Sequence, residues 1–374
     1  MSRRGNGEGS ISRRPEGRWQ AQITVEGKRR SAYGRTREDA AAKLQALQAG
    51  ASAGLPAVDQ RATVSSYLTR WLEQVTPRLR PTTVTRYRGL VTGQIIPTLG
   101  RHRLRELAPS DVARMMALVQ GDGLSARTAG HCRAVLRAAL SDAERDGLVS
   151  RNVARLADPI HLPPPAPTVL SPAEVWAVLD AMPDPGLHRL VSVAVTTGLR
   201  LGEQLGLTWG DIDFEGRRLH VRTALQRLGG AYSLTEPKSA SSRRTVALPA
   251  AALEALTEER RWQGEARLAA GGRWHEPIRG LVFTTSTGAP RNGTALTHML
   301  QAELERAGLP RLRWHDLRAA HGSLLLAGGT DISVVSRRLG HSSVSLTSRH
   351  YGGVADALQH AAADRLGQLL QRPG

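Results

Sequence analysis

Apolar and polar positions alternate in the first part of the chain, and the pattern then changes to a helical repeat. Strand-like alternation is present around Ile11, over Trp19–Val25 and over Lys28–Tyr33, with turn sequences containing proline or glycine between them. Apolar residues then recur at helical spacing from Thr36 to about Ala49, and the threonine is a good N-cap. The pattern predicts a small α+β domain with a three-stranded antiparallel sheet and one helix.

The next hundred or so residues are helical throughout. Helices are expected over Thr63–Glu73, from Pro81 to about Ile95, from Pro109 onward, and from Ser125 to about Asp146. Prolines at first helical positions and a glycine after the last helix mark these boundaries. We therefore expect a second, all-α domain.

A proline-rich stretch, HLPPPAPTV, separates these helices from the rest of the chain. Such a stretch is stiff and extended, as expected of a connector between domains. The predicted fold is multidomain, with a mainly α last domain that contains a small antiparallel sheet. The predicted parts are residues 1–56, 57–160, 161–168 as linker, and 169–374.

The last part begins with helical signals and then changes to strands. An apolar helix is expected over Leu187–Thr197, and it ends at Gly198, which can adopt the left-handed conformation. Strands are expected over Arg218–Ala224, Tyr232–Thr235 and Arg244–Leu248.

Two further helices are expected near the C-terminal end. His315 and Arg318 stand three apart at the start of an apolar-periodic run, so a helix places both on one face. A glycine pair then predicts a turn, and a second helix starts at Thr330 or Asp331 and ends at Gly340.

Beyond that helix the chain carries two more groups that can act in chemistry. His341 follows the helix end directly, and Tyr351 comes ten residues later. With His315 and Arg318 they form neither a usual metal site nor a hydrolase triad. They suit a phosphodiester, because arginine and histidine neutralise phosphate oxygens while a hydroxyl attacks phosphorus.

Composition supports a polyanionic partner. The net charge is +18 and the isoelectric point is near 11.3, so nucleic acid is the first candidate, although a basic surface without a defined ligand is an alternative. Aromatic residues make up only 4%, which argues against a protein that stacks single-stranded bases.

Cysteine usage and hydropathy limit the remaining classes. A single cysteine, Cys132, excludes an internal disulfide and a cysteine-based zinc site. We find no apolar run that could span a membrane and no signal-peptide pattern, so we expect a cytoplasmic protein without membrane contact.

Three further residues stand out in the last domain. Arg200 lies beside the helix end at Gly198, and Glu203 could orient its guanidinium. Lys238 is one of only three lysines in a chain rich in arginine, and it falls in a turn between two expected strands. Such a lysine usually faces solvent, but lysine can act as a proton donor where arginine cannot.

These motifs together resemble the active site of the tyrosine recombinases, the phage integrase family. The matching stretches are TGLRLGE, the lysine of EPKSASSRR, HDLR, LGHSS and the tyrosine of SRHYGG. The resemblance extends over most of the chain: residues 10–50 look like the AP2-like arm-site-binding domain, and residues 63–160 like the helical, SAM-like core-binding domain.

The resemblance implies a mechanism for these positions. Tyr351 would attack the scissile phosphate, forming a 3′-phosphotyrosyl bond and freeing a 5′-hydroxyl. Arg200 and Arg318 would bind the nonbridging oxygens of the phosphate, and Lys238 would protonate the leaving 5′-oxygen. His315 would be the general acid or base, and His341 would donate a hydrogen bond to the phosphate. Strand exchange through a Holliday junction would need no ATP, metal or other cofactor.

The resemblance also implies partners. These are double-stranded DNA at core-type and arm-type sites, a homotetramer on DNA, an excision factor and a DNA-bending host protein. Phosphate contacts are the usual role of basic side chains on DNA, although a solvated surface is the alternative for each. The candidate DNA-contacting residues are Arg13, Arg14, Arg18, Arg29, Arg30, Arg80, Arg86 and Arg88.

The sequence is also compatible with two other functions. A topoisomerase of type IB shares the same chemistry, and a catalytically inactive DNA-binding regulator shares the fold. His321, on the same expected helix as His315, is expected to be structural. The C-terminal apolar stripe, with Leu358 and Leu366 among its members, could pack on its own domain or on a neighbouring protomer.

Overall fold

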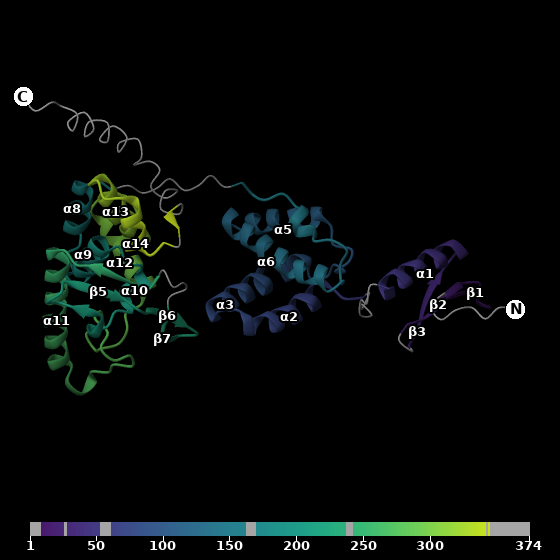
Figure 1. Cartoon of the computed structure of the whole chain (residues 1–374), viewed down its shortest axis with the longest axis horizontal. Coiled ribbons are helices and arrows are strands. Elements are labelled where there is room, and N and C mark those ends of the chain that lie inside the picture. The colour runs from purple at the N-terminus through teal and green to yellow at the C-terminus, as the bar shows by residue number, and fades with distance from the viewer. Residues whose placement is uncertain are drawn as a thin grey trace, which may run out of the picture. The chain divides into compact units, whose positions relative to one another are not determined.

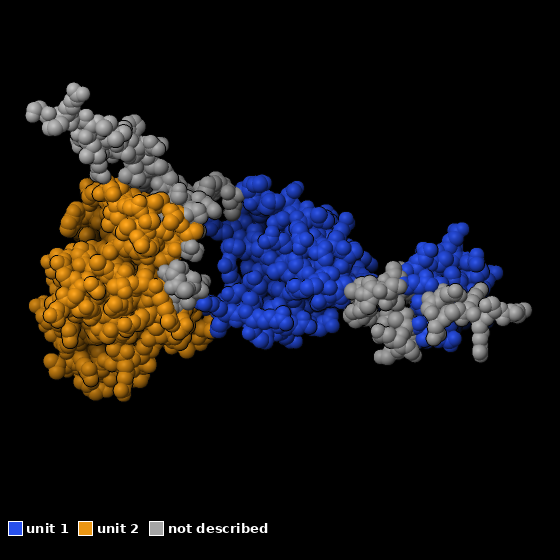
Figure 2. Space-filling model, viewed as in Figure 1, with its two compact units in different colours: residues 1–163 blue, residues 164–374 orange. Residues whose placement is uncertain are grey.

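The computed structural model describes residues 9–25, 28–52, 61–161, 170–236, 242–341 and 343–344. The chain divides into two compact units, residues 1–163 and 164–374 (Figure 2). Several predictions fall outside the described residues: most of the proline-rich connector, the turn that contains Lys238, and the segment with Tyr351 and the C-terminal stripe.

The predicted N-terminal α+β module is confirmed. Strands β1 (Ser10–Arg13), β2 (Trp19–Val25) and β3 (Lys28–Gly34) form an antiparallel sheet in the order β1-β2-β3. Helix α1 (Arg37–Ser52) packs on this sheet (Figure 1). Alternate strand positions meet the helix, as expected for a sheet with one covered face. The small core consists of Ala21, Ile23, Ala40 and Leu44.

The sheet was also expected to carry Arg13, Arg14, Arg18, Arg29 and Arg30 on its strands, and this expectation is wrong for two of them. Arg14 and Arg18 do not lie on strands but in the turn between β1 and β2, where the backbone N–H of Arg14 donates to the carbonyl of Arg18 at 2.8 Å. Of these five arginines, Arg13, Arg29 and Arg30 belong to strands. The turn spans Arg14 to Arg18, and the second strand begins at Trp19 as predicted.

The four helices predicted for the second part of the chain are confirmed, with two additions. The second helix continues through a π-helical turn and one further helical turn, and this continuation buries Val91, Ile95 and Leu99 in the core. A four-residue helix, α7, was not predicted, since one turn is too short to show a period. The elements are α2 (Val64–Val75), α3 (Pro81–Leu90), η2 (Val91–Ile95), α4 (Ile96–Leu99), α5 (Pro109–Gly121), α6 (Ala126–Arg145) and α7 (Val153–Leu156).

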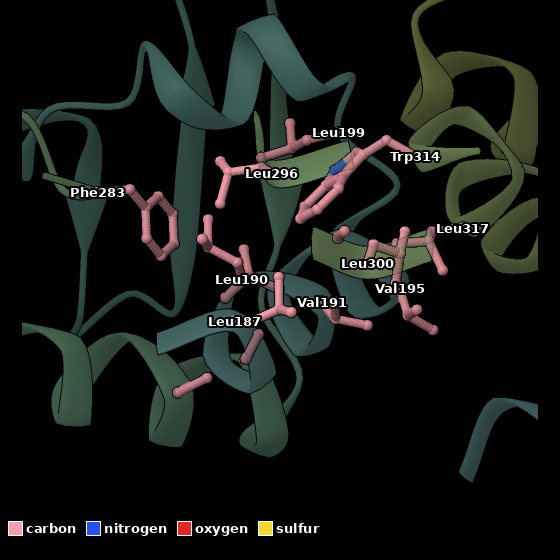
Figure 3. Close-up of a cluster of buried hydrophobic side chains, with 14 of the residues drawn as sticks. Leu187, Leu190, Val191, Val195, Leu199, Phe283, Leu296, Leu300, Trp314 and Leu317 are labelled. Atoms are coloured by element: carbon pink, nitrogen blue, oxygen red, sulfur yellow. The ribbon is translucent and has the colours of Figure 1, made fainter. Parts of the chain in front are cut away.

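The second unit is built around helix α9 (Pro185–Thr197), which contacts α8, α11 and α13. Figure 3 shows its side chains Leu187, Leu190, Val191 and Val195 among apolar residues of the later helices. Burial on nearly all sides makes this helix the axis of the unit. The other helices are α8 (Pro172–Asp180), α10 (Leu201–Leu205), α11 (Ala250–Ala270), α12 (Gly293–Arg306), α13 (Trp314–Ala327) and α14 (Ile332–Leu339).

The strands of this unit form two small antiparallel sheets rather than one. The single strand predicted over Arg218–Ala224 is wrong, because the chain leaves the first sheet at Arg222. The Thr223 hydroxyl donates to the Gly206 carbonyl at 3.0 Å, which holds the chain as it enters the second sheet. The sheets are β4 (Ile212–Asp213), β5 (Arg218–Val221) and β8 (Arg244–Ala247), and the hairpin of β6 (Ala224–Leu228) and β7 (Ala231–Thr235).

No helix among the described residues is both long enough and apolar enough to cross a membrane.

Gly198 ends α9 in the predicted left-handed conformation, with φ of 66°. A Cβ atom at this position would lie 2.6 Å from Cδ2 of His321 and 2.9 Å from Cδ2 of Leu339. Glycine is therefore required here for two reasons, its backbone conformation and the close approach of α13 and α14.

Gly198→Ala should lower stability more than the same change at Gly308. Gly308 also follows a helix and has φ of 68°, but nothing lies within 4 Å of its missing Cβ. The backbone cost, about 1–2 kcal/mol, is common to both variants, and the overlap with His321 adds about 1–3 kcal/mol only at Gly198. Urea unfolding of the two variants measures the difference, and equal losses would contradict the packing argument.

Candidate active site

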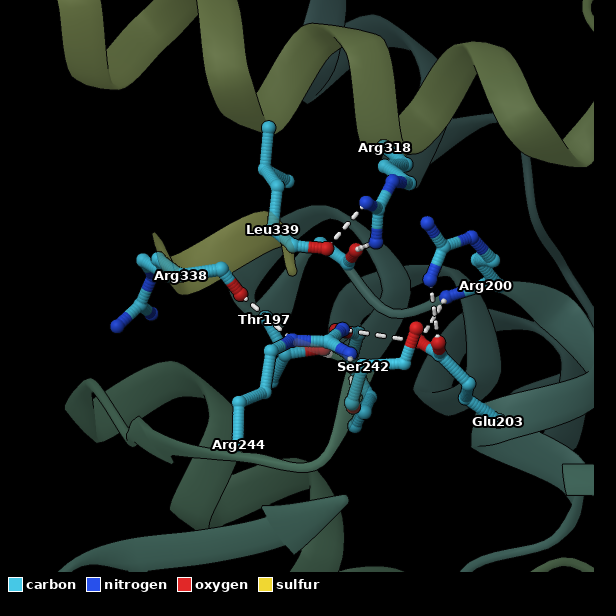
Figure 4. A network of polar contacts seen from close by, with 10 residues as sticks. Thr197, Arg200, Glu203, Ser242, Arg244, Arg318, Arg338 and Leu339 are labelled. Carbon is cyan, nitrogen blue, oxygen red and sulfur yellow. Dashed lines mark hydrogen bonds and ion pairs between the residues drawn. The ribbon is translucent and has the colours of Figure 1, made fainter. Parts of the chain in front are cut away.

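The buried guanidinium of Arg318 joins two helix ends. Its Nη1 donates to the carbonyl of Gly198 at 2.7 Å, and its Nη2 donates to the carbonyl of Leu339 (Figure 4). These carbonyls stand two residues before Arg200 and two residues before His341, respectively. One side chain, only 2% exposed, therefore brings together two of the segments that the sequence singled out.

The two helix ends explain why a cation can be buried here. Gly198 caps α9 and Leu339 is the last residue of α14, so both carbonyls lack a partner within their helices. The C-terminal end of a helix also carries partial negative charge, which favours a nearby cation. Left-handed glycines, Gly198 and Gly340, end both helices and leave these carbonyls accessible to Arg318.

Glu203 holds two arginines at once. Its Oε1 lies 2.6 Å from Nη1 of Arg200, and its Oε2 accepts hydrogen bonds from Nη2 of Arg244 at 2.9 Å and from the backbone N–H of Arg200 at 3.0 Å. The expected contact between Glu203 and Arg200 is thus present. Burial alone raises the pKa of Glu203, but the hydrogen bond and charge of Arg244, together with Arg200, outweigh it and lower the pKa to about 2.

Arg244 closes the network, and it was not among the residues predicted from the sequence. Its Nε donates to the carbonyl of Arg338 at 2.7 Å, one residue before the carbonyl that binds Arg318. A signal was available, since Arg244 alternates with the buried Val246 and Leu248 and so occupies an inward-facing position of its strand.

His315 and Arg318 were predicted to share one helix face, but they differ in burial. His315 is exposed in the first turn of α13, whereas Arg318 is buried. Three residues turn a helix by about 300°, so the two side chains point about 60° apart. The helix therefore places Arg318 in the interior and His315 at the surface.

His321 makes structural contacts, as expected. Its Nδ1 lies 2.7 Å from the carbonyl of Val195, and its Nε2 accepts a hydrogen bond from Nε of Arg338 at 2.9 Å. A carbonyl only accepts, so Nδ1 carries the proton and the ring is neutral. Burial, followed by the charge of Arg338, lowers the pKa of His321 to about 3.

The network has more positive than negative groups. It contains four guanidinium groups, those of Arg200, Arg244, Arg318 and Arg338, and one carboxylate, that of Glu203. This excess of positive charge favours binding of an anion nearby, and an arginine that contacts the anion can make directional hydrogen bonds to several phosphate oxygens. Lys238 and Tyr351 lie outside the described residues, so the structure places neither of them relative to this network.

Comparison with known proteins identifies the family. The model of the phage integrase family matches residues 169–357, and that of the phage integrase N-terminal SAM-like domain matches residues 63–116. The chain belongs to the phage integrase family. The resemblance inferred from the active-site motifs is therefore confirmed.

Two relatives are similar to the chain over most of its length. An integrase of Streptomyces ambofaciens is 31% identical over 331 residues, covering 85% of this chain and 83% of that protein. A tyrosine recombinase XerC-like protein of Caldanaerobacter subterraneus subsp. tengcongensis is 28% identical over 360 residues, covering 91% of this chain and 92% of that protein.

Two solved integrases share the fold. The Tn1549 transposon integrase in complex with transposon right end DNA has a TM-score of 0.68 and 22% identity, covering 81% of this chain and all of that one (100%). A lambda integrase tetramer bound to a Holliday junction has a TM-score of 0.60 and 18% identity, and the match covers 93% of this chain and 96% of that one. The helix-rich, multidomain architecture with small antiparallel sheets is therefore that of an integrase.

The integrase's N-terminal sheet has an open face made of hydrogen-bonded polar side chains. Gln20 accepts from Nε of Arg14 at 2.7 Å and donates to the hydroxyls of Ser31 and Tyr33 at 3.2 and 3.3 Å. Arg14 also lies over the Tyr33 ring, 5.7 Å from its centroid. Although it belongs to a turn, Arg14 is thus held over this face.

Strand register separates the other candidate arginines of the sheet. Arg29 pairs with Thr24, at an open-face position, whereas Arg13 pairs with Trp19, which packs against the core under α1. In the helical part, Arg80, Arg86 and Arg88 are all exposed on or beside α3.

Glu203→Gln should destabilise the integrase at neutral pH, because two buried or half-buried guanidinium groups lose their counter-charge. We expect a loss of about 3 kcal/mol. Since folding lowers the pKa of Glu203 from 4.5 to about 2, the wild-type advantage is complete above pH 4.5 and is lost as the pH falls toward about 2.

Urea unfolding of both proteins between pH 7 and pH 2 measures this gap. Glu265→Gln is the matched control, because Glu265 forms an exposed pair with Arg261 and should change stability little. A gap between wild type and Glu203→Gln that does not depend on pH would contradict the ion-pair argument.

Proposed function

We propose that this integrase is a site-specific DNA recombinase that breaks and rejoins strands through a covalent bond between DNA and Tyr351. The observation that carries the proposal is the network in which Arg318 ties the Arg200 segment to the His341 segment. Membership of the phage integrase family and relatives named integrase and tyrosine recombinase support it.

In the proposed cleavage step, one bond to phosphorus forms as another breaks. The Tyr351 oxygen attacks phosphorus, a 3′-phosphotyrosyl bond forms, and the bond from phosphorus to the 5′-oxygen breaks. His315 takes the tyrosine proton, and Lys238 gives a proton to the leaving 5′-oxygen. The 5′-hydroxyl of a second duplex then attacks the phosphotyrosine, so that strands exchange through a Holliday junction.

Arg200 and Arg318 would stabilise the charge that develops on the nonbridging oxygens, and His341 would add a hydrogen bond. The contacts with Glu203 and with the two helix-end carbonyls favour this role, because they fix both guanidinium groups before DNA binds. Preorganised donors of this kind are worth about 10²–10³ in rate each.

The roles of the individual parts of the chain, and its partners, belong to the same proposal. We assign arm-site binding to residues 1–56, core-site binding to residues 57–160, a linker to 161–168 and catalysis to residues 169–374.

A homotetramer on DNA is supported by the lambda integrase tetramer on a Holliday junction. We propose that the enzyme integrates and excises a phage or another mobile element. For this it would act in the cytoplasm, together with an excision factor and a DNA-bending host protein.

The nucleophile can be tested with a nicked suicide substrate that carries the core site. The wild-type chain should form a covalent protein–DNA adduct, and Tyr351→Phe should form none, because the attacking oxygen is gone. Denaturing gels measure the adduct, and a gel shift on the same DNA checks that the variant still binds. An adduct with Tyr351→Phe would refute the assignment.

The proposed binding of arm-site DNA by the N-terminal sheet can be tested at its open face. Arg29→Ala should weaken binding to arm-site DNA by about 1–3 kcal/mol and leave core-site cleavage unchanged, because arginine on a groove-facing surface contacts bases or phosphates. Arg37→Ala, on the helix that covers the other face, is the control and should bind normally. Fluorescence anisotropy on arm-site DNA separates the two, and equal effects of both variants would count against the open face.

A further inference from the structure

The side chain of Arg338 connects four elements of the catalytic unit. Its Nε donates to Nε2 of His321 on α13 at 2.9 Å. Its Nη2 donates to the carbonyl of Ala247, at the end of β8, at 3.0 Å and to the carbonyl of Thr196, near the end of α9, at 3.3 Å. Its own carbonyl accepts from Arg244. Nothing in the proposed chemistry uses this side chain.

His321 can accept from Arg338 only while it is neutral. The proton on Nδ1 is directed to the carbonyl of Val195, which leaves a lone pair on Nε2 for the Arg338 donor. A protonated ring would lose that lone pair and would repel the guanidinium. The histidine thus fixes the orientation of Arg338 as a neutral acceptor.

Arg338 connects the same two helix ends as Arg318, and its acceptor on α9 lies two residues from that of Arg318. Arg318 binds the carbonyls of Gly198 and Leu339. Arg338 binds the carbonyl of Thr196, two residues before Gly198, and itself immediately precedes Leu339. The ends of α9 and α14, which carry Arg200 and His341 just beyond them, are therefore joined by two arginines rather than one.

We propose that Arg338, with His321 as its neutral acceptor, is a positioning residue for strand cleavage. It holds the end of α14 so that Arg318 and His341 face the same phosphate as Arg200. This inference rests on the proposed recombinase function. It assigns no contact with DNA to Arg338, so its loss should slow the chemical step while DNA affinity is kept.

Four variants of the full chain test this role. Arg338→Met keeps much of the side-chain length and removes the donors. His321→Leu removes both imidazole contacts, whereas His321→Gln keeps an acceptor for Arg338 and a donor for the Val195 carbonyl. Arg337→Met is the control, since it removes the same charge from an exposed neighbour on the same helix.

The measurements are the rate of adduct formation on the suicide substrate at saturating protein and the Kd for the core site. Arg338→Met and His321→Leu should cleave about 10- to 100-fold more slowly, because small displacements of reacting groups cost this much. Their Kd should stay within about threefold of wild type, since no DNA contact is removed. His321→Gln and Arg337→Met should cleave at close to the wild-type rate.

The double variant Arg338→Met/His321→Leu should be no slower than the slower single variant, because both remove one shared interaction. Thermal melting checks folding. If Arg338→Met does not fold, the comparison of His321→Leu with His321→Gln still decides the role of the pair.

Two results would overturn the proposal. Weaker DNA binding by Arg338→Met at an unchanged saturating rate would make Arg338 a phosphate ligand instead. Cleavage by His321→Leu at the wild-type rate would show that the pair does not position the site. Failure of the proposed function would look different, because the wild-type chain itself would then form no adduct.

Discussion

The catalytic unit depends on one buried guanidinium held between two helix C-termini. A buried cation is costly unless its donors are satisfied. Here the carbonyls of Gly198 and Leu339 satisfy two donors of Arg318, and both helix dipoles add favourable charge. The same bonds bring the chain that leads to Arg200 next to the chain that leads to His341. Close approach at Gly198, where a Cβ would overlap His321, makes this arrangement possible.

The second constraint is electrostatic. Glu203 is the carboxylate of a network that contains four arginines, and its low pKa keeps it charged over the whole physiological range. Its two oxygens are shared between Arg200 and Arg244, so the former is oriented and the latter is neutralised in the interior. The remaining positive charge suits a phosphodiester, which links the fold of the site to the chemistry proposed for it.

Signals from neighbouring residues in the chain were sufficient for much of this description. Proline and threonine caps, left-handed glycines and apolar periods act over a few residues, and they correctly predicted α9, α13, α14 and the N-terminal sheet. Where tertiary contacts decide, prediction failed. The break at Arg222 depends on Thr223 reaching the Gly206 carbonyl, and the position of Arg14 depends on how the hairpin closes.

The sequence by itself determined the identity and spacing of Arg200, Glu203, Arg318 and His341, because a motif and a helix end are local features. Only the tertiary structure revealed what holds them together. Arg244 meets Glu203 from 41 residues away and Arg338 from 94, and Arg318 meets Gly198 from 120. Contacts over such distances follow from the packing of helices on α9 and have no local pattern. The contacts of Arg244 and Arg338 were therefore recognisable only once the chain was folded, although alternation with Val246 and Leu248 already indicated that Arg244 faces inward.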